Sequence, residues 1–198
     1  MIFRHRETPD AGNGLEKQLR SLEQQAEIAL PGFDAQFFNR AGDLCVEAKD
    51  RSRALGYYGR AIDAYLRAGR YNASGAVCRK LLRISPGSVR ARCTLAWLSI
   101  GKGLLGDAQW EVDEYVDAAV AAGQGDLARR HLRMMAEATY NPELRALLAD
   151  HLHKLGDENA ASLAGPPPEV EPAREEAEAL WSRVLRAALM GPEDLRSE

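Results

Sequence analysis

The stretch that decides the fold is Leu55–Ser88, which reads LGYYGRAIDAYLRAGRYNASGAVCRKLLRISPGS. Apolar residues recur at helical spacing over residues 58–65 and again over residues 77–82. Gly69 separates the two runs, and because glycine tolerates the left-handed conformation that ends a helix, we expect the first helix to stop there. Pro86 has no amide hydrogen to donate, so it ends the second helix. The stretch therefore predicts two short amphipathic helices joined by a tight turn, with apolar faces that require further neighbours.

These 34 residues resemble one unit of a tetratricopeptide repeat, in which aromatic, large, small and proline positions recur at fixed steps. The matching positions are Tyr58, Ala61, Ile62, Tyr65, Ser74, Cys78 and Pro86. A weaker copy follows over 89–122, and a partial copy begins at Pro142. An overlapping match over 35–68 uses Phe38, Ala41, Gly42, Cys45, Ala54 and Tyr58. Because the frames 35–68 and 55–88 share one helix, the sequence leaves open which of them is the first true hairpin. The resemblance implies an all-α fold, a superhelix of αα-hairpins that forms a right-handed solenoid.

Amphipathic patterns continue on both sides of this stretch, and the junctions between them carry glycine, proline or asparagine. No segment alternates apolar and polar residues with the β-branched enrichment of a strand, so the sequence predicts no sheet. The helices are expected at residues 15–30, 34–48, 51–68, 71–84, 88–101, 106–122, 126–139 and 142–155.

Composition and periodicity divide the chain into five segments. Residues 1–14 lack apolar periodicity and are expected to form a flexible N-terminal arm, followed by the helical repeat domain at 15–163. Residues 164–172 contain a run of prolines, which predicts an extended linker. Residues 173–190 form an amphipathic helix whose apolar stripe needs a surface, so we expect it to cap the repeat domain, and 191–198 form a tail.

The composition is that of a globular protein, with 45% hydrophobic and 28% charged residues. No apolar run approaches the roughly 20 residues that span a bilayer, so we expect no membrane insertion. The first residues contain no apolar segment typical of a secretory signal. Cys45, Cys78 and Cys93 are an odd set on helical patterns, which suits buried thiols in a reducing compartment. We therefore predict a cytoplasmic location.

Charge is distributed unevenly along the chain. Residues 49–92 contain eleven Lys/Arg and two Asp, a net charge of +9, whereas residues 93–198 contain ten basic and nineteen acidic residues, a net charge of −9. Arginine matches the geometry of carboxylates and phosphates, so the basic segment favours an acidic protein or peptide partner. Solvated helix faces that pair with the acidic C-terminal region are the plainer interpretation. Nucleic acid ranks third, because the whole chain carries a net charge of −3.

The sequence patterns give little indication of a catalytic, cofactor or metal site. Gly101–Gly106 fits the dinucleotide-binding pattern G-x-G-x-x-G, but that pattern needs a preceding strand, and the residues before it follow a helical pattern. We therefore interpret it as a turn between helices. His151 and His153 lie about 200° apart around a helix, so they cannot bind one metal ion together. Cys78 has no base beside it. We expect no catalytic residues, no cofactor and no metal, and hence no enzyme.

The family resemblance also implies a binding site. In tetratricopeptide repeat proteins, partners lie along the concave face, on the first helix of each hairpin. Carried over to this sequence, the partner-binding candidates are Asp63, Arg67, Arg90 and Trp97. An aromatic anchor beside arginine is a frequent combination at binding hot spots. The leucine face of helix 15–30 would form a homodimer or cap the stack, and we favour the cap.

Two functions are consistent with these patterns. The first is a non-enzymatic scaffold or adaptor that holds a partner segment on the concave face. The alternative is a self-occluding regulatory module, in which the acidic helix at 173–190 docks on the basic repeat surface and is displaced by a partner. Deletion of residues 165–198 separates the two, because loss of a cap lowers stability whereas loss of an occluding helix tightens partner binding.

Overall fold

The computed structural model describes residues 9–30 and 32–165, and within these ranges the chain is helical and contains no strand. The described helices are α1 (Pro9–Ile28), α2 (Asp34–Glu47), α3 (Arg51–Arg67), α4 (Tyr71–Ile84), α5 (Val89–Lys102), α6 (Leu105–Ala121), α7 (Gly125–Ala138), α8 (Pro142–Lys154) and α9 (Ala160–Leu163). The all-α prediction is confirmed for this part of the chain. None of these helices combines the length and the apolarity that crossing a membrane requires.

The observed helix ends agree closely with the expected ones, with two differences. α1 begins at Pro9, so it extends into the segment predicted as an arm. The short helix α9 was not expected, because four residues carry too little periodicity to be recognised. The predicted helix at 173–190, most of the linker at 164–172 and the tail lie outside the described residues.

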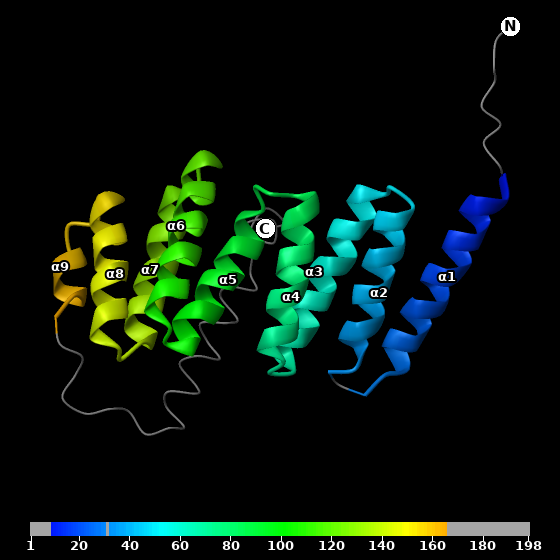
Figure 1. The fold of residues 1–198 in the computed structure, drawn as a ribbon, viewed down its shortest axis with the longest axis horizontal. Helices are drawn as coiled ribbons and strands as arrows, with labels where there is room; N and C mark the ends of the chain where they lie inside the picture. Colours follow the sequence, from blue (N-terminus) through cyan, green and yellow to red (C-terminus); the bar gives the residue numbers. More distant parts are fainter. Residues whose placement is uncertain (1–8, 31, 166–198) are drawn as a thin grey trace, which may run out of the picture. The chain divides into compact units, whose positions relative to one another are not determined.

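The helices fall into two compact units, divided between Ser85 and Pro86. In the first unit α1–α4 lie side by side, each packing against the next (Figure 1). Its core contains Leu19, Ala41, Cys45 and Ala54, from three different helices. Leu15 and Leu22 are partly buried against the same core, so the leucine face of α1 packs at least in part within the chain, and a homodimer through it stays a prediction.

α2 and α3 approach each other closely at Gly42. A Cβ atom built on Gly42 would lie only 2.5 Å from the Tyr58 ring, which is too close for any side chain. Both residues are matching positions of the frame 35–68. α3 also packs against α4, the second helix of the frame 55–88, so α3 has a helical neighbour on either side. A superhelical, tetratricopeptide-like arrangement stays a prediction.

The second unit contains α5–α9 (Figure 1). It has a hydrophobic core of its own. α5 packs against α6, α7 packs against α8, and α6 also contacts both α7 and α8. The largest side chains that are fully buried in this core are Trp97, Val112, Tyr115, Leu132, Met135, Leu144, Leu148 and Leu152. The expected repeat domain at 15–163 therefore comprises helices from two units, each with a separate hydrophobic core.

Local signals fix where individual helices begin and end. Asp50 caps α3, because its carboxylate accepts a hydrogen bond from the backbone amide of Arg53 (3.0 Å). Asn141 caps α8 in the same way, directly before Pro142 at the first helical position. Gly69 follows α3 with a φ of 67°, a left-handed conformation that favours glycine over other residues.

Candidate interaction surface

The structure places the four predicted partner-binding residues in two pairs. Asp63 and Arg67 lie on α3 in the first unit, where Asp63 is half-buried and Arg67 is exposed in the last helical turn. Arg90 and Trp97 lie on α5 in the second unit, and Arg90 is half-buried near the start of that helix. Of the four, Arg67 is the one fully presented to solvent.

Trp97 is enclosed by the core of the second unit. Its side chain is 0% exposed and belongs to a cluster of buried residues from α5, α6, α7 and α8. A partner would reach the indole only after this core had opened. The structure therefore gives Trp97 a packing role in the described conformation.

Three arginines form a stripe along α3. Arg53, Arg60 and Arg67 are seven residues apart, a spacing that returns to the same face of a helix after two turns. Two of them are bound by acidic residues of α1 that have the same spacing: Arg53 pairs with Glu16, and Arg60 pairs with Glu23 at 3.5 Å. α1 is thus aligned on α3 by charges that match in register.

Aromatic rings complete this contact between the helices. The guanidinium of Arg60 lies 4.0 Å from the ring centroid of Phe38 and 6.0 Å from that of Tyr57. The hydroxyl of Tyr57 donates a hydrogen bond to Glu23 (2.9 Å). Burial, and then this bond to the carboxylate, raise the pKa of Tyr57 to about 12. An acidic amphipathic helix therefore occupies an arginine and aromatic surface within this chain.

The stripe continues to a patch of exposed residues at the end of the first unit. We call it the arginine–apolar patch and define it by Ile28, Leu30, Phe33, Arg67 and Arg70. Ile28 is 85% exposed and Leu30 73% exposed, and all five side chains are open to solvent. The parts of the patch touch, because Arg70 lies 5.4 Å from the centre of the Phe33 ring. Figure 1 shows the ends of α1 and α3 at the same end of this unit.

The loop after α1 and the turn after α3 meet within this patch. Gly32 has a φ of 88°, and a Cβ built on it would lie 2.8 Å from the Cβ of Ala68. The close approach therefore holds the loop that carries Leu30 and Phe33 against the turn that carries Arg67 and Arg70.

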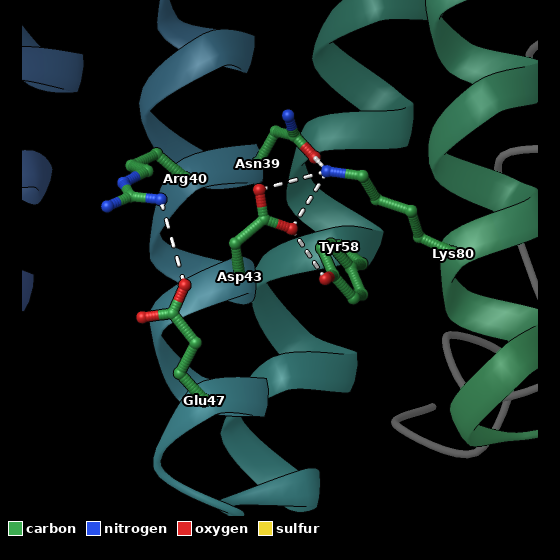
Figure 2. Close-up of polar contacts among 6 residues, drawn as sticks. All are labelled: Asn39, Arg40, Asp43, Glu47, Tyr58 and Lys80. Carbon is green, nitrogen blue, oxygen red and sulfur yellow. Dashed lines mark hydrogen bonds and ion pairs between the residues drawn. The ribbon is translucent and has the colours of Figure 1, made fainter.

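A polar cluster joins α2, α3 and α4 elsewhere in the first unit (Figure 2). The ammonium of Lys80 donates to Asn39 (3.0 Å) and to both carboxylate oxygens of Asp43 (2.8 and 2.9 Å). The hydroxyl of Tyr58 also donates to Asp43 (2.7 Å). Since the ammonium has only three donors, these bonds satisfy it fully. The cluster therefore fixes α2, α3 and α4 relative to one another.

The second unit contains a thiol beside an imidazole. Nδ1 of His131 lies 2.8 Å from the hydroxyl of Tyr115 and 3.3 Å from the sulfur of Cys93. Sequence reasoning did not pair these residues, because Cys93 and His131 lie on different helices and 38 positions apart. Burial raises the pKa of Cys93 to about 12 and lowers that of His131 to about 4. Both groups are neutral at neutral pH, so the thiol lacks the ionised form that a nucleophile needs.

The remaining sequence motifs are also explained by local structure. Gly101 lies in the last turn of α5 and Gly106 in the first turn of α6, and Gly103 has a φ of 69° between the two helices. The interpretation as a turn between helices is confirmed, since the motif joins α5 to α6 and the described residues before it, 9–30 and 32–100, contain no strand. Within residues 9–30 and 32–165, no cluster of three or more His, Cys, Asp or Glu side chains is arranged to hold a metal ion.

Comparison with known proteins finds no matching family model, no matching curated protein and no matching solved structure. The resemblance to tetratricopeptide repeats therefore stays a prediction that rests on the residue positions quoted above.

Proposed function

We propose that this chain is a non-enzymatic interaction scaffold that binds an acidic, apolar segment of a partner protein at the arginine–apolar patch. The observation that carries the proposal is the stripe Arg53, Arg60 and Arg67, of which the first two already hold an acidic helix of the same chain. Arg67 repeats the pattern at a place where large apolar side chains are exposed.

The binding of α1 indicates what the partner segment should resemble. α1 contributes Glu16 and Glu23 to the arginines and Leu19 to the apolar core beneath. A partner with carboxylates beside leucine-like residues would present the same combination to Arg67, Arg70 and the exposed apolar residues. Arginine binds carboxylates through two parallel hydrogen bonds, which fixes the orientation of the segment.

The apolar residues and the arginines of the patch are expected to contribute different amounts of binding free energy. Burying one large apolar side chain contributes roughly 1.5–3 kcal/mol, whereas an exposed ion pair contributes about 0.2–1 kcal/mol. The apolar residues Ile28, Leu30 and Phe33 therefore supply most of the affinity. Arg67 and Arg70 supply selectivity for acidic segments and faster association.

A synthetic peptide tests the proposal directly. A fluorescent peptide of about 18 residues, built from leucine and glutamate with one apolar face, is titrated with the full chain, and the dissociation constant is measured by anisotropy. Arg67→Glu should weaken binding by about tenfold, and Leu30→Ser by at least as much. Arg51→Glu is the matched control, because Arg51 is an exposed arginine on the opposite side of the same helix.

The control makes the outcome decisive. If Arg67→Glu and Arg51→Glu weaken peptide binding equally, binding depends only on the net charge of the chain, and the arginine–apolar patch is not the site. Circular dichroism of each variant should match that of the unchanged chain, since the substituted side chains are exposed.

The self-occluding alternative involves residues 173–190, which lie outside the described residues, and it stays a prediction. The same peptide assay with residues 165–198 deleted addresses it. Tighter peptide binding would support occlusion, and unchanged binding would contradict it. The cytoplasmic location also stays a prediction.

A further inference from the structure

α6 in the second unit exposes a face that its own core does not use. Trp110, Asp113, Asp117 and Val120 follow one another at intervals of three, four and three residues, which places them on one side of the helix. Val112, Tyr115 and Ala119 of the same helix are 0% exposed and pack in the core. The helix therefore has a buried side and a separate, outward side.

Two large apolar side chains are exposed on the outward side. The indole of Trp110 is 59% exposed and Val120 is 53% exposed. Large apolar side chains that gather on a surface, with polar residues around them, mark interaction sites in soluble proteins. Tryptophan in particular contributes strongly to binding when a partner covers it.

The same side is also acidic. α6 contains five acidic residues and no lysine or arginine. Glu114 pairs with Arg92, and Asp113 lies 3.0 Å from Nε2 of His151. Asp107 and Asp117 lie exposed on either side of Trp110 along the helix.

We infer that the outward face of α6 is a second docking surface, which binds a basic amphipathic helix of a partner protein. Lysine or arginine of such a helix would pair with Asp107 and Asp117 and would also lie over the indole of Trp110, a favourable cation–π geometry. Trp110 and Val120 are ten residues apart, about 15 Å along the axis of α6. This distance matches the apolar stripe of a partner helix of roughly three turns.

Charge selects this occupant over others. A symmetric dimer through α6 would bring two acidic α6 faces together, and like charges across an interface are repulsive. Anionic lipid surfaces attract basic residues rather than acidic ones. A basic, apolar protein segment satisfies both the charge and the exposed indole. Together with the arginine–apolar patch in the first unit, α6 makes the chain bivalent for partners of opposite charge.

A peptide of opposite charge to the first one tests this surface. A fluorescent amphipathic peptide of about 18 residues, built from leucine and lysine, is titrated with the full chain and its dissociation constant is measured by anisotropy. Trp110→Ser should weaken binding by about tenfold or more. Asp117→Asn should weaken it by a few-fold and make binding less sensitive to salt.

Matched controls come from the same chain. Glu137→Gln removes an exposed carboxylate from α7, and Tyr71→Ser removes an exposed aromatic residue from the first unit. Both variants should bind the lysine peptide like the unchanged chain. If Trp110→Ser and Asp117→Asn bind as tightly as these controls, the inference is overturned. Arg67→Glu should weaken binding of the glutamate peptide and leave binding of the lysine peptide unchanged. Failure of this inference and failure of the proposed function are therefore distinguishable.

Discussion

Acidification between neutral pH and pH 5 should destabilise the second unit through His131. This imidazole is buried, with Nδ1 2.8 Å from the hydroxyl of Tyr115, and burial lowers its pKa from 6.5 to about 4. In the unfolded chain the same imidazole takes up a proton near its ordinary pKa. The unfolded state therefore binds more protons between about pH 6.5 and pH 4, so stability falls through this window as the pH is lowered and the loss levels off below it.

The size of the effect follows from the two pKa values. A fall from 6.5 to about 4 corresponds to roughly 3 kcal/mol over the whole window. Roughly 2 kcal/mol of this is lost between about pH 7 and pH 5, because at pH 5 the unfolded imidazole is protonated while the folded one is still mostly neutral. Carboxylates with a lowered pKa, such as Asp157 beside Arg133, lose their stabilising contribution at lower pH, below their ordinary value of 3.8.

His131→Gln provides the comparison, because glutamine keeps a polar side chain near Tyr115 but does not titrate. Urea unfolding of both proteins is followed by tryptophan fluorescence, which reports on the second unit since Trp97 and Trp110 lie there and residues 1–85 contain no tryptophan. The unchanged chain should lose about 2 kcal/mol more than the variant between pH 7 and pH 5.

Equal losses in the two proteins would refute the reasoning, because His131 would then take up its proton equally in the folded and unfolded states. His151 also has a pKa lowered by burial, but it is present in both proteins and its contribution cancels. An NMR titration of the unchanged chain gives an independent check, since the ring signals of His131 should stay constant above about pH 5.

Four further substitutions test the packing and the helix ends. Gly42→Ala should destabilise the first unit by roughly 1–3 kcal/mol in urea unfolding, because the added methyl group meets the Tyr58 ring. Gly56→Ala should instead stabilise the first unit by about 0.5–1 kcal/mol, because Gly56 lies in open space on α3. Arg145→Met should destabilise the second unit by roughly 1.5–3 kcal/mol, since the buried guanidinium donates to backbone carbonyls at the end of α7. Asn141→Ala should remove the cap of α8 and cost about 1 kcal/mol in the same assay, and an unchanged midpoint would show that the cap is dispensable.

The helices were predictable because their signals are local. Gly69 ends α3 through its own backbone conformation, and Asn141 with Pro142 starts α8, so short stretches of sequence suffice to place these boundaries. The division between Ser85 and Pro86 was not predicted, because it depends on which helices share a core. That property arises from contacts between residues far apart in the sequence.

The candidate site was harder to predict for the same reason. Arg67 lies exposed as a binding residue requires, but Trp97 is buried in a core that four helices build together. The run Cys93–Ile100 did contain a signal, since it has no charged residue and its apolar residues cover most of the helix circumference, and such helices are usually buried. Trp110 carried a weaker signal, since Asp113 and Asp117 follow it at helical spacing and place it on a polar side of α6.

The burial of all three cysteines has a practical consequence for experiments on this protein. Cys45, Cys78 and Cys93 are enclosed in the folded chain, and the sequence contains no other thiol. A cysteine introduced at an exposed position, such as Ser52 in the first unit or Gln109 in the second, would be the single thiol that a thiol-reactive dye labels in the folded protein. Each unit can therefore carry its own reporter while every native cysteine stays in place.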